Sequence, residues 1–133
     1  MHRILSQIET LDRIDDTIAA FVRSGELSES ESKSIREDIN RWLADERVSS
    51  WFSPGVNVWT EREILQPDGS FYRPDRVVET DNEVIVVDYK FGNVERASYK
   101  RQVNTYTSLI EKMGYDRVPG FIWYVCLGKL ERV

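Results

Sequence analysis

Two aspartates and a lysine carry the candidate chemistry of this chain, in the segment RPDRVVETDNEVIVVDYKFG (residues 73–92). Asp75 stands near its start, and Asp88 and Lys90 follow the apolar run VIVV. Charged groups at the end of a buried strand need partners, because an unpaired buried charge is costly. Oxygen ligands without a thiolate favour a hard cation such as Mg²⁺ or Mn²⁺. The segment therefore predicts a divalent-metal site.

Three segments with apolar residues at every second position must place these carboxylates. They are VNVWTEREIL, SFYRPDRVV and EVIVVDYKF, and the turn sequences QPDG and ETDN separate them. Alternation interrupted by short Gly, Pro, Asn and Asp clusters is typical of strands joined by hairpins. The sequence from residue 56 to residue 91 therefore predicts an antiparallel meander of three strands.

The turns also predict which residues face one another. A two-residue turn at Asp81-Asn82 places Asp75 opposite Asp88. A three-residue loop at Pro67-Asp68-Gly69 places Glu61 opposite Asp75 and turns Glu63 toward Arg73 instead. Glu61, Asp75 and Asp88 then form a row on one sheet face, which Lys90 shares because side chains alternate along a strand. A row of charges on a solvated face is the alternative, and the apolar run before Asp88 favours a central strand.

The remaining sequence predicts helices and one further strand. We expect a helix from about Glu95 to Met113, with Tyr99, Val103, Tyr106, Ile110 and Met113 on one face, followed by the buried strand GFIWYVCL. Together with the preceding strand this forms a βαβ crossover. Residues 1–53 read as helical, with a capping box at Ser28–Glu31 and apolar residues at helical spacing: Ile4, Leu5, Ile8, Leu11, Ile14, Ile18, Phe21, Val22, Ile35, Ile39, Trp42 and Leu43.

The expected fold class is therefore α/β: a mixed sheet of a meander plus a βαβ crossover, flanked by helices, with an N-terminal helical region. The 133 residues fit a single domain, with residues 1–53 as the helical region and residues 54–133 as the core. The net charge of −5 gives no broad attraction to nucleic acid, but Lys90, Arg96, Lys100 and Arg101 form a local basic excess around Glu95.

Composition also limits the cofactors and the compartment. Cys126 is the single cysteine, and its apolar surroundings predict a buried, inert thiol, so we expect neither a disulfide nor an iron–sulfur cluster. No segment has the length and apolarity of a membrane span, and the start MHRILSQIETLDRIDD lacks the features of a signal peptide. We expect a cytoplasmic protein without a membrane partner.

The ordered set TEREI, RPDRVV, VIVVDYKFG and Gln102-x-x-x-Tyr106 resembles the PD-(D/E)xK nuclease superfamily. Within it, the set is most similar to the RecB-like nuclease domains at the C-terminal end of AddA and RecB helicase-nucleases. An isolated D-x-K is common, whereas the full ordered set is specific and covers the chain from about Val56 to Val133. The resemblance implies a restriction-endonuclease-like core, here as a C-terminal fragment of a longer polypeptide.

The resemblance also implies roles for individual residues. Asp75 and Asp88 would bind the metal together with the backbone carbonyl of Tyr89, and Lys90 would position the attacking water and stabilise charge on the scissile phosphate. Glu61 matches the acidic residue of the preceding strand. Gln102 and Tyr106, one helical turn apart, match the motif that supports the site and the DNA in RecB-like members.

A histidine on an upstream helix completes the metal site of RecB-like nucleases, in a pattern like Gly-Thr-x-x-His-x-x-Leu. His2-Arg3-Ile4-Leu5 is similar to its second half, although the glycine and threonine are missing. His2 as a metal ligand and His2 as a solvated terminal residue both remain open, and the metal ligand is slightly favoured.

The function implied is an Mg²⁺- or Mn²⁺-dependent deoxyribonuclease of double-strand-break repair and recombination. Its partners would be DNA, the helicase portion of the parent polypeptide and a second helicase-nuclease subunit. Phosphate contacts would come from Arg73, Arg96, Lys100 and Arg101 without base readout, and a solvated helix face is an equal alternative for the last three. Two other functions stay open: a non-catalytic DNA-binding or scaffolding domain with the same fold, and a dimeric restriction or junction-resolving endonuclease.

Overall fold

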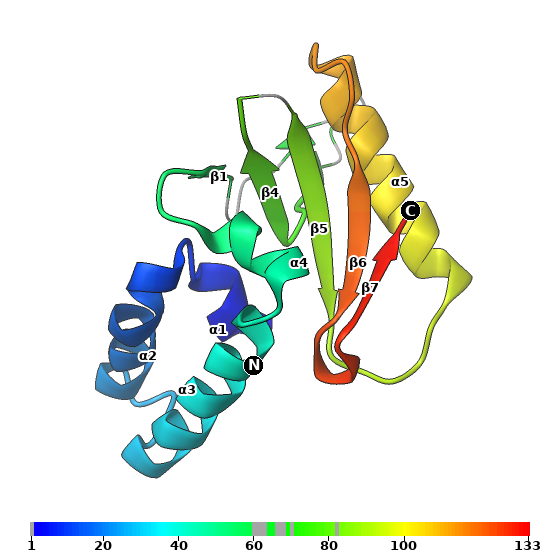
Figure 1. Cartoon of the computed structure of the whole chain (residues 1–133). Helices are drawn as coiled ribbons and strands as arrows, with labels where there is room; N and C mark the ends of the chain where they lie inside the picture. Colours follow the sequence, from blue (N-terminus) through cyan, green and yellow to red (C-terminus); the bar gives the residue numbers. More distant parts are fainter. Residues whose placement is uncertain (1, 60–63, 66–68, 70, 82) are drawn as a thin grey trace. The chain divides into compact units, whose positions relative to one another are not determined.

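A computed structural model describes residues 2–59, 64–65, 69, 71–81 and 83–133 of the chain. The chain divides into two compact units, Met1–Val56 and Asn57–Val133 (Figure 1). The boundary lies three residues after the end of the expected helical region at residue 53. Within the described residues, no helix combines the length and the apolarity that crossing a membrane requires.

The first unit contains helices, as its periodicity predicted. Its α-helices are α1 (His2–Gln7), α2 (Ile14–Arg23), α3 (Glu29–Leu43) and α4 (Glu46–Ser49), with short 3-10 turns η1 (Leu11–Arg13) and η2 (Ser50–Phe52). The capping box is confirmed, because Ser28 Oγ accepts from the Glu31 N–H at 3.1 Å and the Glu31 carboxylate accepts from the Ser28 N–H at 3.2 Å. Gly25 adopts φ +80° just after α2, a conformation that ends a helix.

The second unit is a mixed sheet with one long helix. The sheet has the order β1-β4-β5-β6-β7, and β2 and β3 form a separate hairpin. The strands are β1 (Asn57–Val58), β2 (Ile64–Leu65), β3 (Phe71–Tyr72), β4 (Arg76–Glu79), β5 (Val84–Lys90), β6 (Gly120–Tyr124) and β7 (Lys129–Arg132), and the helix is α5 (Ala97–Lys112). Because β5 and β6 are parallel and α5 connects them, the βαβ crossover is confirmed, and the unit is α/β with a mixed sheet.

The register of the second hairpin agrees with its turn sequence. Arg76 pairs with Val87 and Glu79 with Val84, so the next position of the ladder brings Asp75 beside Asp88, as predicted. In the first hairpin Ile64 pairs with Tyr72, the register that the Pro67–Gly69 loop predicted. Gly69 has φ +89°, which a non-glycine residue would adopt only with strain.

The meander itself differs from three continuous strands. The second predicted strand consists of β3 and β4, with Pro74 between them. Proline has no N–H to donate to a neighbouring strand, which explains why the ladder is broken there. The first predicted strand includes β1 and β2, and Glu61 and Glu63 lie outside the described residues.

The C-terminal segment was predicted incorrectly in one respect. GFIWYVCL is not one strand, because β6 ends at Tyr124 and is followed by the 3-10 turn η3 (Val125–Leu127) and by Gly128 in the left-handed region at φ +62°. The chain then returns as β7, antiparallel to β6, with Tyr124 paired to Lys129. Cys126 lies in this turn and is exposed, so the expectation of a buried thiol is wrong.

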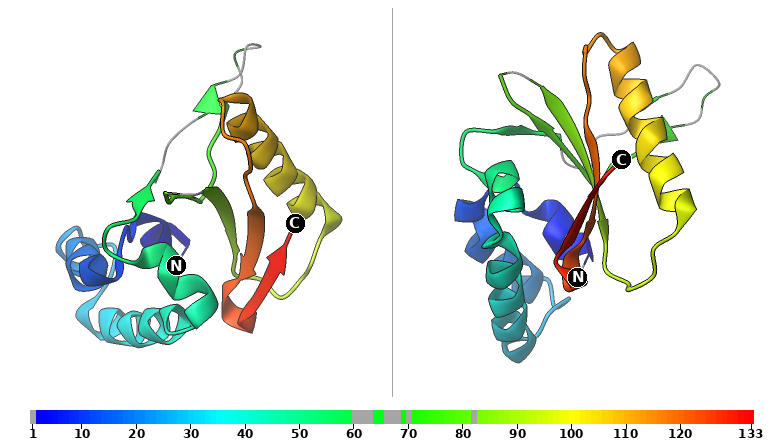
Figure 2. Two further views of the ribbon diagram at one scale, coloured as in Figure 1. Left: turned by 45° about the horizontal axis from the view of Figure 1, so that its top comes forward. Right: turned by 45° about the vertical axis from the view of Figure 1, so that its right-hand side comes forward.

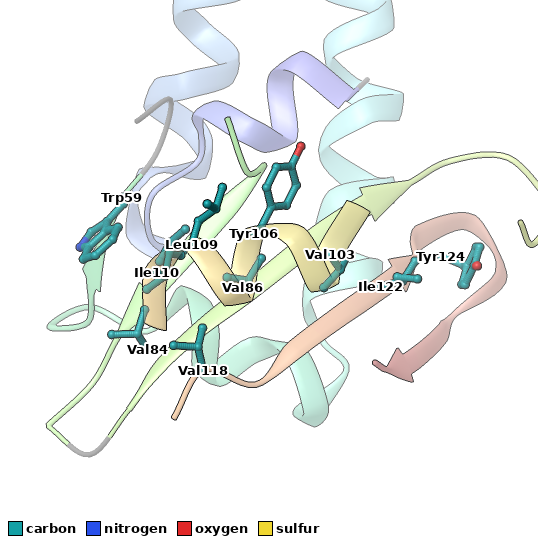
Figure 3. Packing of buried hydrophobic residues seen from close by; sticks show 11 residues of the cluster. Trp59, Val84, Val86, Val103, Tyr106, Leu109, Ile110, Val118, Ile122 and Tyr124 are labelled. Atoms are coloured by element: carbon teal, nitrogen blue, oxygen red, sulfur yellow. The ribbon is translucent and has the colours of Figure 1, made fainter. Parts of the chain in front are cut away.

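The core lies between one face of the sheet and α5, as Figure 3 shows for its apolar side chains. Val84, Val86 and Ile122 from the strands pack with Val103 and Ile110 from the helix. Two further views show α5 running beside the sheet (Figure 2). At Gly120 the two layers approach so closely that an added Cβ would lie 2.5 Å from Val103 Cγ1. Packing therefore favours glycine at this position.

Two apolar residues expected on buried faces are exposed. Leu11 is 36% exposed, and it belongs to the short 3-10 segment η1 and not to an α-helix. Met113 is 55% exposed, since it caps the C-terminal end of α5.

Candidate active site

Asp75 and Asp88 lie side by side at one end of the β4–β5 pairing, where β4 begins and β5 approaches its end. Asp75 immediately precedes β4, and one of its oxygens, Oδ2, accepts a hydrogen bond of 2.8 Å from the backbone N–H of Tyr89. Asp88 belongs to β5 and is only 3% exposed. The Tyr89 contact fixes Asp75 against the end of β5, so the predicted pairing of the two carboxylates is present in the fold.

The two carboxylates perturb each other strongly. The pKa of Asp88 is raised to about 7, mainly by burial and then by the hydrogen bond and the charge of Asp75, whereas Lys90 acts in the opposite direction. Two adjacent carboxylates, one of them buried, are both ionised only at a high cost in free energy unless a cation compensates their charge. At neutral pH the pair therefore holds either a proton or a positively charged partner.

Lys90 supplies part of that positive charge. Its Nζ lies 2.8 Å from Asp88 Oδ2, and its side chain is 22% exposed. Within the described residues, Oδ2 accepts no hydrogen bond of regular geometry although it is fully buried, so the contact with Lys90 is an ion pair. Oδ2 thus retains lone-pair capacity for a further cation.

The helix α5 reaches this cluster from the side of the core. Lys90 Nζ donates to Gln102 Oε1 at 3.3 Å, and Gln102 Nε2 donates to the hydroxyl of Tyr106 at 3.0 Å. Gln102 is exposed, whereas Tyr106 is buried. The structure therefore brings Asp75, Asp88, Lys90, Gln102 and Tyr106 into one chain of contacts, on residues that the sequence motifs had singled out.

The residues present fit a hard divalent cation. The two adjacent carboxylates are oxygen donors, and each raises the need for a positive charge near the other. Mg²⁺ is commonly held by one or two carboxylates, with water and substrate phosphate completing its coordination. Among the described residues no group of three His, Cys, Asp or Glu side chains is placed to hold a metal.

The side chains of two further predicted metal ligands, Glu61 and His2, lie outside the part of the chain that the structure describes. Glu61 lies outside the described residues, and its position opposite Asp75 stays a prediction. His2 is the first residue of α1 in the other unit, and its side chain also lies outside the described part of the chain.

Tyr89 and Arg76 support the cluster from the opposite face of the sheet. The Tyr89 side chain is buried and meets the Trp123 ring edge-on at 5.7 Å between centroids, which agrees with its predicted packing role. Burial raises the pKa of the Tyr89 hydroxyl, and the positive charge of the nearby Arg76 opposes this. Arg76 is completely buried. Sequence reasoning missed it, although a charged residue between Asp75 and the apolar pair Val77-Val78 is a visible signal.

The basic residues proposed for phosphate contacts differ in the ion pairs that the structure shows for them. Arg73, Arg96 and Arg101 have exposed side chains. Lys100 forms an ion pair with Glu131 of β7, with Nζ and Oε1 2.9 Å apart. Lys129, also from β7, pairs with Glu95. The sequence did not indicate these pairs because β7 itself was not predicted.

Comparison with known proteins adds no further evidence on the family. No model of a protein family matches the chain, and no curated protein matches it either.

Proposed function

We propose that this chain is a divalent-metal-dependent deoxyribonuclease module with a restriction-endonuclease-like core of the PD-(D/E)xK type. The observation that carries the proposal is the adjacent pair Asp75 and Asp88, with the Lys90 ammonium 2.8 Å from Asp88 Oδ2. The ordered motifs RPD, DYK and Gln102-x-x-x-Tyr106 belong to this pattern, and their residues meet at one place in the fold.

The metal would be held by Asp75 and Asp88, with the backbone carbonyl of Tyr89 as a further ligand. Glu61 and His2 are additional candidate ligands by resemblance alone. When bound, Mg²⁺ or Mn²⁺ would lower the pKa of a coordinated water and neutralise charge on the phosphate oxygens. The hydrogen bond from the Tyr89 N–H to Asp75 keeps the first carboxylate pointed at the second, so the ligand pair is preorganised.

Lys90 would act on the substrate. Its ammonium lies at the partly exposed side of the carboxylate pair, and its flexible stem can carry a point charge toward a phosphate oxygen. There it would hold the attacking water in line with the scissile P–O bond and stabilise the negative charge that develops. Gln102, which accepts from Lys90 and donates to Tyr106, limits where the ammonium can lie.

DNA would be held through its phosphates. Arg73, Arg96 and Arg101 offer exposed guanidinium groups, and guanidinium binds phosphate oxygens in a bidentate manner. Such contacts do not read bases, so we expect cleavage that is independent of sequence and strongly weakened by salt.

The same motifs support a role for this chain as one module of a larger helicase-nuclease enzyme. In the RecB-like pattern the nuclease module acts beside an ATP-dependent helicase in double-strand-break repair and recombination. We propose that the partners of this chain are the helicase portion of such a polypeptide and a second helicase-nuclease subunit.

Cleavage of linear single-stranded and duplex DNA tests the proposal, with Mg²⁺, Mn²⁺ or EDTA present. We expect cleavage in either metal and none in EDTA, and we expect Asp88→Asn and Lys90→Ala to abolish it. Asp81→Asn and Lys112→Ala are the matched controls, because these residues are exposed and lie away from the contacts of the site. Binding of DNA without cleavage in any metal would contradict the proposal and favour a non-catalytic domain with this fold.

A further inference from the structure

The aromatic ring of Tyr99 faces the ammonium of Lys90. Lys90 Nζ lies 4.4 Å from the centroid of the Tyr99 ring, well within the range of a cation–π contact. The same Nζ contacts Asp88 on one side and Gln102 on another. The ammonium is thus surrounded by a carboxylate, an amide oxygen and the face of a ring.

The Tyr99 ring is itself held in place. Its centroid lies 6.5 Å from that of Tyr124, with the two planes inclined by 50°. Tyr124 is buried and is the residue of β6 that pairs with Lys90 in the parallel register. Tyr99 therefore reaches Lys90 from the first turn of α5, and its neighbour on the adjacent strand fixes the ring.

We propose that Tyr99 is a positioning residue for Lys90. This inference rests on the proposed function, in which Lys90 acts on the scissile phosphate. If a divalent cation were held by the carboxylate pair, the attraction of Asp88 for Lys90 would weaken, because the cation would neutralise part of the carboxylate charge. The ring of Tyr99 and the amide oxygen of Gln102 then keep the ammonium beside the site, and neither group competes with the phosphate as a carboxylate does.

The alternative is that Tyr99 has only a packing role beside the core. Tyr115 provides the comparison, since Tyr99 and Tyr115 are both partly buried and pack against the same core cluster. Tyr115 makes its ring contact with Trp59, at 5.7 Å between centroids. A substitution at Tyr115 therefore removes similar packing without touching Lys90.

Proton chemical shifts of Lys90 test the contact without any need for activity. Protons above the face of an aromatic ring are shifted upfield, so the Lys90 Hε signal, assigned by its loss in Lys90→Met, should lie upfield in the wild type and in Tyr99→Phe. It should move to the position of exposed lysines in Tyr99→Leu and stay unchanged in Tyr115→Leu. An Hε signal that does not respond to Tyr99→Leu overturns the proposal.

Kinetics on DNA test the consequence. We expect kcat in Tyr99→Leu to fall about tenfold with little change in KM, since a misplaced Lys90 affects the chemical step, and we expect Tyr99→Phe to restore most of the rate. An equal loss of kcat in Tyr115→Leu would overturn the positioning role in favour of packing. If the wild type cleaves no DNA, the proposed function fails, and the chemical shifts still decide whether Tyr99 holds Lys90.

Discussion

The backbone N–H of Tyr89 donates a hydrogen bond to Asp75 Oδ2 over 2.8 Å, and this contact joins the residue before β4 to the centre of the site on β5. Tyr89 lies between Asp88 and Lys90 in sequence, and its side chain packs on the other face of the sheet. One strand therefore presents Asp88 and Lys90 on one face and also anchors Asp75 through its backbone. The geometry of the carboxylate pair depends on β5 as a whole.

Asp75→Asn should change stability and metal binding in opposite directions. An amide at this position can still accept from the Tyr89 N–H, and it removes the charge that raises the pKa of Asp88. We expect a higher Tm in EDTA at pH 7.5 and loss of the stabilisation that Mn²⁺ gives to the wild type, which would be about 2.7 kcal/mol at a hundredfold excess over Kd. Differential scanning fluorimetry measures both, with Asp81→Asn as the control. Retained stabilisation by Mn²⁺ in Asp75→Asn would exclude Asp75 as a ligand.

The stability of the metal-free protein should fall as the pH rises toward neutrality. Burial and Asp75 raise the pKa of Asp88 from its ordinary value of 3.8 to about 7, so the folded state binds this proton more tightly than the unfolded state. The stabilisation is complete below about pH 4 and is lost as the pH passes through about 7, at a rate of at most about 1.4 kcal/mol per pH unit.

Urea unfolding in EDTA at pH 5 and pH 7.5 measures this difference, with Asp88→Asn as the reference that lacks the titrating group. We expect the wild type to lose more stability between the two pH values than Asp88→Asn does. Equal losses in both proteins would show that Asp88 titrates normally.

Glu131→Gln should strengthen DNA binding. The Glu131 carboxylate holds Lys100 at 2.9 Å, and removing its charge releases a cation on α5 beside Arg101. Because ion pairs near the surface contribute only about 0–1 kcal/mol, the free energy of unfolding should change little. We expect a several-fold lower Kd at low salt and a steeper dependence of log Kd on log salt.

Fluorescence anisotropy with labelled DNA provides this measurement. Glu111→Gln is the matched control, since it changes the net charge equally on an exposed position near the other end of α5. Equal gains in both variants would mean that only net charge matters and that Lys100 does not contact the phosphates.

Gly120→Ala should destabilise the fold. The new Cβ would lie 2.5 Å from Val103 Cγ1 and 2.9 Å from Thr107 Cγ2, so β6 and α5 would have to move apart. Overpacking of this kind costs about 1–3 kcal/mol. Chemical denaturation measures the loss, and Val103→Ala in the same chain should recover part of it by making room. A double variant that loses the sum of the two single losses would contradict the close approach.

Much of this architecture can be read from the sequence, because its signals are local. The turn residues Pro67–Gly69 and Asp81-Asn82 specify loop lengths, and loop length sets the register that brings Asp75 beside Asp88. The capping box at Ser28 and the apolar spacing of α5 are local in the same sense. The grouping of Asp75 and Asp88 with Lys90 was therefore predictable without any tertiary information.

The rest was decided by tertiary structure. Gln102 reaches Lys90, and Tyr99 lies over it, because the crossover packs α5 against β5 and β6, a long-range contact that no local pattern specifies. Glu131 meets Lys100 only because the chain reverses at Gly128 into β7, where a single glycine was too weak a signal. Burial of Asp88, which raises its pKa, likewise arises from the packing of layers around β5. Sequence determined which groups share a strand face, and packing determined which of them touch and how strongly they are perturbed.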